Sequence, residues 1–206
     1  MFHNNCENDS FARFDEMLTG IEARFGELLS QVEWVSLGGG IHFTGEGYPL
    51  DDFCQRLKDF AQRWGVQVYL EPGEAAITNT CTLEVTVLDT LFNGKHLAIV
   101  DSSIEAHLLD LLIYRETATL LPNTGTHEYM VCGKSCLAGD IFGEFKFEQP
   151  LNIGDRLSFQ DTAGYTMVKK NWFNGVQMPA IAIKQLDGRI ELVKEFTYRD
   201  FVQGLS

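Results

Sequence analysis

The sequence has no long hydrophobic run and little positive charge. No segment approaches the ~20 apolar residues that a membrane span needs, and the opening Met-Phe-His-Asn-Asn lacks the basic start and apolar core of a signal peptide. The 16 basic residues are outnumbered by 29 acidic ones, so the net charge is −13. This charge argues against nucleic-acid or anionic-membrane partners, and it suits either a cationic ligand or solubility alone. We expect a cytoplasmic protein.

Cysteine is also scarce and shows no pairing pattern. The five cysteines are an odd number without the density of a disulfide framework, and Cys132-x-x-x-Cys136 has no second pair that would complete a zinc site. Reduced thiols and no structural metal are therefore expected. By contrast, 45 % of the 206 residues are hydrophobic, which is enough for a sizeable core in one or two domains.

Residues 1–77 predict alternating helices and strands. Behind a cap at Asp9 or Ser10, apolar residues recur at helical spacing: Phe11, Phe14, Leu18, Ile21, Phe25 and Leu28. Strands at 34–37 and 66–70 flank a second helix, which begins near Pro49 and ends at Gly65. Residues 1–6 are expected to end an earlier strand. Such a series predicts parallel strands with right-handed connections.

Residues 78–206 predict a β domain. Period-two alternation begins at Cys81, and Asn93-Gly94 is a strong hairpin signal. Turn residues separate the expected strands, which lie at 81–87, 97–101, 128–132, 141–148, 156–160, 179–185 and 189–195. We expect these strands to be antiparallel.

The candidate catalytic and binding residues within residues 1–77 follow expected strands. His3, Gly38–Gly40 and Glu71 all fall at the carboxyl ends of expected strands, where parallel α/β folds place their active sites. Three glycines after a strand can wrap a phosphate with their N–H groups, although they can equally form a tight loop. Glu71 is either a cleft carboxylate or a surface one, and Glu74 gives a weaker signal.

In the second part, Cys136 stands in a glycine-punctuated loop close to Lys134, a setting that favours a reactive thiol, although a free cysteine is also a small buried hydrophobe. Tyr165 follows a turn and can be a core tyrosine. Glu105 and His107 can be ordinary hairpin surface.

Taken together, five ordered motifs resemble one superfamily. They are Phe2-His-Asn-Asn-Cys-Glu7, Leu37-Gly-Gly-Gly-Ile-His-Phe-Thr44, Tyr69-Leu-Glu-Pro-Gly-Glu-Ala75, Cys132-Gly-Lys-Ser-Cys-Leu-Ala-Gly-Asp140 and Gly164-Tyr165 followed by Asn171-Trp-Phe-Asn-Gly175. In this order they resemble the fold type III pyridoxal-phosphate decarboxylases, the ornithine/diaminopimelate decarboxylase superfamily. The variants of these motifs are most similar to the carboxynorspermidine (carboxyspermidine) decarboxylases. The resemblance covers essentially the whole chain.

This resemblance implies a fold class of α/β plus all-β. Residues 1–77 would be the last strands and helices of a cofactor-binding (β/α)8 barrel, and residues 78–206 an antiparallel β-barrel or sandwich domain. About three strands cannot close a barrel of eight, which takes about 250 residues. The superfamily's cofactor-bearing lysine lies upstream of the stretch that Phe2-His3 matches. We therefore expect the C-terminal half, or slightly more, of a homodimeric enzyme, or a chain that complements a missing N-terminal half.

The resemblance also implies roles for individual residues. His3 would stack on the pyridoxal-phosphate ring, Gly38, Gly39, Gly40 and Tyr165 would hold its phosphate, and Glu71 would face the pyridine nitrogen and make the ring an electron sink. Cys136 would act across the dimer interface as the general acid that protonates the carbanion left by decarboxylation. The residues implied to meet a cationic, carboxylated polyamine are Glu74, Asp101, Glu105, His107 and Asp140.

Two departures from the superfamily pattern narrow the substrate. Leu137 replaces the aspartate that follows the cysteine in ornithine decarboxylases, which argues against ornithine, and Glu74 replaces a phosphate-binding arginine. The implied function is the decarboxylation of carboxynorspermidine or carboxyspermidine in polyamine synthesis. The alternative is a non-catalytic, decarboxylase-like protein that binds and regulates an intact partner.

Overall fold

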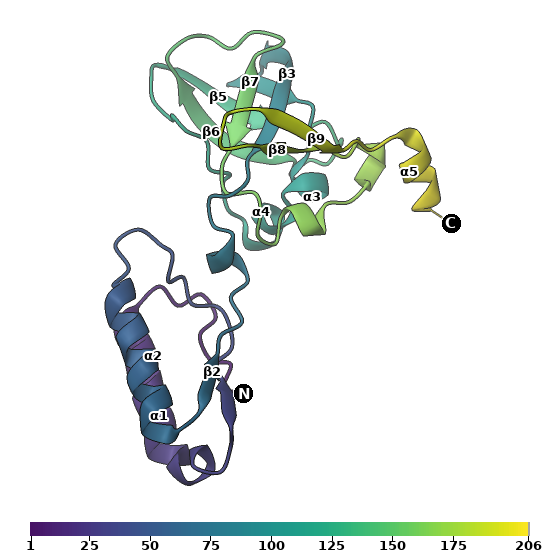
Figure 1. The fold of residues 1–206 in the computed structure, drawn as a ribbon. Coiled ribbons are helices and arrows are strands. Elements are labelled where there is room, and N and C mark those ends of the chain that lie inside the picture. The colour runs from purple at the N-terminus through teal and green to yellow at the C-terminus, as the bar shows by residue number, and fades with distance from the viewer. Residues whose placement is uncertain (206) are drawn as a thin grey trace. The chain divides into compact units, whose positions relative to one another are not determined.

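The computed structural model describes residues 1–205, and within it the chain divides into two compact units (Figure 1). The N-terminal unit spans Met1–Thr78 and the C-terminal unit begins at Asn79. Each has its own hydrophobic core. Among the described helices, none has the length and apolar character needed to cross a membrane.

The N-terminal unit is a βαβ arrangement with one additional helix. Its elements are α1 (Phe11–Leu29), β1 (Trp34–Ser36), α2 (Leu50–Trp64), β2 (Gln67–Tyr69) and a 3₁₀ turn at Glu74–Ala76. Strands β1 and β2 pair in parallel, with Val35 opposite Val68, which confirms the predicted direction. Gly65 ends α2 in the left-handed conformation that favours glycine. Both helices lie on one side of the strand pair (Figure 1).

Helix α1 follows its predicted pattern except near its end. Ser10 caps it, because its side chain accepts a hydrogen bond from the Arg13 N–H. Phe14, Leu18 and Ile21 are buried as predicted. The prediction for Phe25 and Leu28 was wrong: the helix kinks at Phe25, and the buried stripe continues at Leu29 instead.

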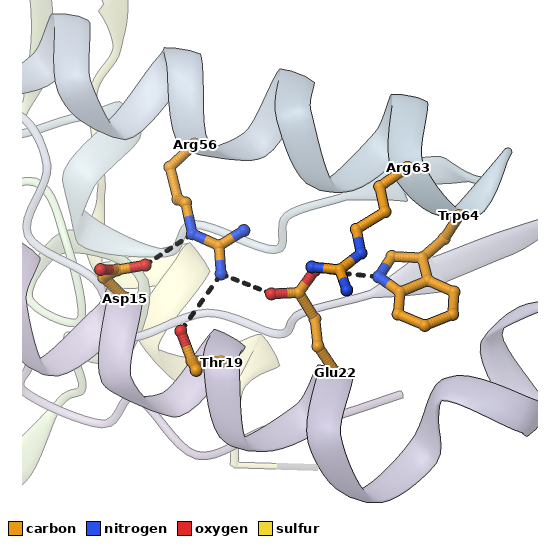
Figure 2. A network of polar contacts seen from close by, with 6 residues as sticks. All are labelled: Asp15, Thr19, Glu22, Arg56, Arg63 and Trp64. Carbon is orange, nitrogen blue, oxygen red and sulfur yellow. Dashed lines mark hydrogen bonds and ion pairs between the residues drawn. The ribbon is translucent and has the colours of Figure 1, made fainter.

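A polar network joins α1 to α2 (Figure 2). Arg56 of α2 donates to Asp15 Oδ1 at 2.5 Å and to Glu22 Oε2 at 2.7 Å, and Glu22 Oε1 accepts from the Trp64 indole at 3.0 Å. A Cβ at Gly26 would come within 2.8 Å of the Trp64 ring, so a glycine is needed for this approach. The network fixes the register of the two helices.

The C-terminal unit is built around one five-stranded sheet in the order β6-β5-β4-β3-β7. Its strands are β3 (Leu83–Phe92), β4 (His96–Val100), β5 (His127–Cys132), β6 (Ile141–Phe147) and β7 (Arg156–Phe159), and a separate hairpin is formed by β8 (Ile181–Lys184) and β9 (Ile190–Lys194). Three short helices are α3 (Ile104–His107), α4 (Leu109–Tyr114) and α5 (Tyr198–Gln203). Each predicted strand is present, and Asn93-Gly94 lies in the β3–β4 turn as predicted.

One feature of this sheet differs from the prediction. Strands β4 and β5 are parallel, with Ala98 opposite Val131, whereas a wholly antiparallel domain was expected. The connection between them contains α3 and α4, and parallel neighbours need a crossover of this kind rather than a hairpin. On the buried face, Phe142 stacks on Phe159 with ring centroids 4.6 Å apart.

Candidate functional site

In the N-terminal unit, the candidate site lies where β1 and β2 end. The pairing continues beyond the strands, because Leu37 N–H donates to Tyr69 O and Glu71 N–H donates to Gly38 O, both at 2.9 Å. Adjacent parallel strands have their carboxyl ends at the same edge. The glycine run and Glu71, which are more than 30 positions apart in the sequence, are therefore neighbours.

The first residues of the chain lie along the same edge. Phe2 N–H donates to Ser36 O, and Asn8 forms a parallel bridge with Ile41. The prediction that residues 1–6 end a strand was wrong as an assignment, since no strand is formed there. These backbone contacts nevertheless bring His3 to the glycine run.

Each of the three glycines is required by a different close contact. A Cβ on Gly38 would lie 2.4 Å from His3 Nδ1, one on Gly39 would lie 2.2 Å from the backbone oxygen of Glu71, and one on Gly40 would lie 2.5 Å from that of Asn5. Gly38 and Gly40 also have φ angles of 72° and 86°. The three glycines thus form a loop against which the segments that carry His3, Asn5 and Glu71 pack closely.

His3 is held by two contacts. Its Nδ1 accepts a hydrogen bond from the Gly39 N–H at 3.2 Å, and its Nε2 lies 3.6 Å from Cys6 Sγ. Because a backbone N–H can only donate, Nδ1 is the unprotonated nitrogen of the neutral ring and Nε2 carries the proton. The imidazole is therefore fixed in one tautomer and remains exposed.

The Glu71 carboxylate is held by a residue that the sequence did not reveal. The Ser36 hydroxyl donates to Glu71 Oε1 at 2.5 Å and accepts from the Gly38 N–H at 3.2 Å. Ser36 is 4 % exposed, whereas Glu71 is exposed. A polar residue at the end of a strand that the sequence predicted to be buried was the available signal. Glu74, also exposed, starts the 3₁₀ turn that follows.

In the C-terminal unit, Asp140 organises the loop that carries Cys136. Its carboxylate accepts hydrogen bonds from Ile104 N–H at 2.8 Å, from Ser135 N–H at 3.0 Å and from the Ser135 hydroxyl at 2.6 Å. A Cβ on Gly133 would lie 2.2 Å from its oxygens. Asp140 is only 4 % exposed, so its carboxylate shapes the loop from inside.

Glu105 and His107 also belong to this buried network. The alternative of an exposed hairpin surface was wrong, because both lie on the short helix α3 and are 5 % and 4 % exposed. Glu105 Oε1 lies 2.9 Å from the Ser135 hydroxyl oxygen, whose single proton points to the nearer Asp140, and Glu105 Oε2 accepts from Ser103. The carbonyl oxygen of Glu105 accepts from the Asn171 side chain at 2.7 Å.

His107 is the most perturbed base of this unit. Burial lowers its pKa to about 4, assisted by the positive charge of Lys134 and opposed by Asp140 and Asp101. Its Nδ1 lies 2.7 Å from the Ser102 hydroxyl. The nearby Gln177 backbone also acts to raise the pKa of His107. Among the described residues, however, no group lies within hydrogen-bonding geometry of His107 Nε2. The ring is neutral at pH 7.

The network presents Cys136 to solvent. This residue is exposed and has a φ angle of 70°, and the Ser135 oxygen before it accepts from the Asn174 side chain at 2.6 Å.

Asp101, a predicted substrate contact, is half-buried and accepts a hydrogen bond from Thr86 N–H at 2.8 Å. With Ser102, His107 and Lys134 it lines a cavity of about 1040 Å³. Tyr165 is 50 % exposed, and Lys169 Nζ lies 5.0 Å above its ring centroid.

The chain matches a known family over much of its length. Residues 15–163 match the family described as "Pyridoxal-dependent decarboxylase, C-terminal sheet domain". A carboxynorspermidine/carboxyspermidine decarboxylase of Herminiimonas arsenicoxydans is 65 % identical over 206 residues, which is 100 % of this chain and 56 % of the relative. A carboxyaminopropylagmatine decarboxylase of Synechocystis is 42 % identical over 99 % of this chain and 54 % of its own length.

A solved structure agrees with this assignment. The crystal structure of carboxynorspermidine decarboxylase from Campylobacter jejuni, complexed with norspermidine, superimposes with a TM-score of 0.92 at 36 % identity, covering 98 % of this chain and 59 % of that one. The chain thus spans little more than half the length of these relatives. Together, the family match, the sequence identity and the fold show that the chain belongs to the fold type III pyridoxal-dependent decarboxylases and corresponds to the C-terminal part of the carboxynorspermidine decarboxylases.

Proposed function

We propose that this chain supplies cofactor- and substrate-binding residues to a pyridoxal-phosphate-dependent enzyme that decarboxylates carboxynorspermidine or carboxyspermidine. The observation that carries the proposal is the convergence on Gly39, whose N–H bonds His3 and whose Cα faces the Glu71 backbone too closely for any Cβ. The imidazole of His3 and the backbone that carries Glu71 are thereby both held against one glycine. The 65 % identity to a decarboxylase of this specificity supports the substrate.

The residues present fit the cofactor. Gly38 and Gly39 already use their N–H groups on Ser36 and His3, while in the described chain the Gly40 N–H has no internal acceptor. That N–H can therefore donate a hydrogen bond to a phosphate oxygen. The exposed His3 ring can stack on a pyridine, and Glu71 can accept its ring N–H.

Pyridoxal phosphate, when bound, supplies an electron sink for the bonding electrons that remain at the substrate Cα when carbon dioxide leaves. Glu71 keeps the proton on the pyridine nitrogen, since a carboxylate beside it favours the charged form. His3 orients the ring. Cys136 would deliver a proton to Cα, a general-acid role that an exposed thiol can perform.

Acidic side chains suit a polyamine. Glu74 and Asp101 are the two predicted substrate contacts that keep solvent access, so we assign them to the substrate's ammonium groups. Glu105, His107 and Asp140 are buried and support the Cys136 loop from within. The chain is also 42 % identical to a carboxyaminopropylagmatine decarboxylase. Carboxyaminopropylagmatine is therefore the competing substrate to include in the test.

The test is complementation. The 206-residue chain is co-expressed with the segment of the Herminiimonas relative that it does not cover, and carbon dioxide and polyamine products are measured with carboxynorspermidine, carboxyspermidine and carboxyaminopropylagmatine. We expect norspermidine or spermidine only when both parts are present. The Herminiimonas segment alone is the control. A reconstituted complex that binds pyridoxal phosphate but decarboxylates none of the three substrates would contradict the proposal and favour a regulatory role.

A further inference from the structure

Ser36 makes a two-step connection between the glycine run and Glu71. It is the last residue of β1 and is 96 % buried, yet both of its hydroxyl contacts are with groups at the candidate site. The Gly38 N–H lies 3.2 Å from Ser36 Oγ, which lies 2.5 Å from Glu71 Oε1. A buried hydroxyl at this place therefore links two site elements that come from different strands.

The direction of both hydrogen bonds is fixed by their chemistry. The Gly38 N–H can only donate, and an ionised carboxylate can only accept. The single hydroxyl proton of Ser36 therefore points to Oε1, and its oxygen receives the amide proton. In the described residues no donor reaches Glu71 Oε2, so one carboxylate oxygen is engaged and the other is free.

We infer that Ser36 is a positioning residue: it holds Glu71 by Oε1 and so presents Oε2 to the ring nitrogen of the cofactor. This inference rests on the proposed function. An exposed glutamate has three rotatable bonds, and fixing one oxygen removes most of its alternative orientations before the ligand arrives. A charge-assisted hydrogen bond of this length is strong enough to do so.

A purely structural role for Ser36 makes a different prediction. If the hydroxyl only satisfies the buried Gly38 amide, its removal disturbs the loop and weakens every ligand that the site binds. If it acts through Glu71, its removal weakens only ligands that have a ring nitrogen. Two ligands separate these roles: pyridoxine 5′-phosphate and its 1-deaza analogue, in which a C–H replaces the ring nitrogen.

The experiment is calorimetric titration of both ligands into the chain, alone and complemented by the Herminiimonas segment. Ser36→Ala is expected to weaken pyridoxine 5′-phosphate about fivefold to tenfold, the loss typical of one hydrogen-bonded interaction, and to leave the deaza analogue within about twofold. Ser36→Thr keeps the hydroxyl and is expected to bind both ligands as the wild type does. Ser30→Ala, which removes a hydroxyl that bonds Glu27 O at the end of α1, is the matched control and should change neither affinity.

A second variant keeps the inference testable if Ser36→Ala fails to fold. Ser36→Cys, which keeps a small side chain but donates only a weak hydrogen bond, should show the same selective loss, and in the Glu71→Ala background it should lose nothing further. Equal losses for both ligands, or no loss for either, would overturn the positioning role. Failure of both ligands to bind the complemented wild-type protein is a separate result, which overturns the proposed function and this inference with it.

Discussion

The indole N–H of Trp64 donates a hydrogen bond to Glu22 Oε1 at 3.0 Å, while Arg56 binds the other oxygen of the same carboxylate (Figure 2). Burial alone would raise the pKa of Glu22, but the hydrogen bonds from Arg56 and Trp64 outweigh it, and the pKa lies below 4.5. The charged form is therefore preferred in the folded protein.

The first prediction concerns this carboxylate. Glu22→Gln should destabilise the N-terminal unit at pH 7 by about 1–2 kcal/mol, because it weakens charge-assisted hydrogen bonds to two residues of α2. A lowered folded-state pKa gives stability that is present above the unfolded value of 4.5 and is lost as pH falls below it. The difference between variant and wild type should thus shrink in acid. Urea titrations followed by tryptophan fluorescence measure it, with the exposed Asp59→Asn as control.

The second prediction concerns His107. Its pKa of about 4 in the folded state lies below the ordinary 6.5, so its contribution to stability is complete above pH 6.5 and declines as pH falls toward 4. Linkage gives a loss of about 3 kcal/mol for the C-terminal unit over that interval. His107→Gln should flatten this part of the profile in urea melts at a series of pH values. A variant profile as steep as that of the wild type would rule out His107 as the cause.

The third prediction compares two glycines. Gly40→Ala should destabilise the N-terminal unit by more than about 2 kcal/mol, because it combines a left-handed φ of 86° with contacts of 2.5 and 2.7 Å to backbone atoms of Asn5 and Cys6. Gly20→Ala is the matched control. It lies inside α1 with no atom within 4 Å of the added Cβ, so it should stabilise by about 0.5–1 kcal/mol. Shifts of the same sign in thermal melts would contradict the structure.

The fourth prediction concerns the proton donor. In the complemented enzyme, Cys136→Ala should lower kcat about 100- to 10,000-fold with little change in KM, since a general acid acts in the transition state. Cys132→Ala should retain activity within a few-fold. Cys132 is the matched control because it stands four positions earlier at the end of β5, where burial and the charge of Asp140 raise the pKa of its thiol.

Equal and small losses in the two cysteine variants would show that Cys136 has no chemical role. A further mixing experiment tests whether the site is shared between protomers. Cys136→Ala chains and Glu71→Ala chains, each inactive alone, should regain activity when combined if the two residues act in one site from different subunits. Absence of any rescue would place both residues of a working site in a single chain.

Local patterns predicted most of the elements. The α2 boundaries followed from Pro49 and Gly65, and the strands from period-two alternation, because these signals depend on nearby residues. The parallel β4–β5 pair was missed, since its cause is the crossover through α3 and α4 rather than any residue in either strand. The kink at Phe25 was missed for a similar reason, as helical spacing does not report a local change in φ.

The candidate site was only partly visible in the sequence. His3, Gly38–Gly40 and Glu71 were predicted because they match motifs, and the glycine run and Glu71 also follow observed strands. Ser36 was not found, because its importance depends on a contact with a residue 35 positions away. The burial of Asp140 and Glu105 was likewise hidden, since charged residues are expected at the surface and only the surrounding N–H and hydroxyl donors make an interior position tolerable.

The three consecutive glycines also limit how the protein can evolve. The obstacles to a side chain at Gly39 and Gly40 are main-chain atoms, the oxygen of Glu71 and the oxygen of Asn5 with the Cα of Cys6, and these are the same whatever residues stand there. No second-site substitution among those side chains could relieve such a mutation. At Gly38 the nearest obstacle is the His3 side chain itself, so a compensating change would have to replace the residue that we assign to the cofactor ring. Genetic selection for restored function after a mutation in this run should therefore yield only reversions to glycine.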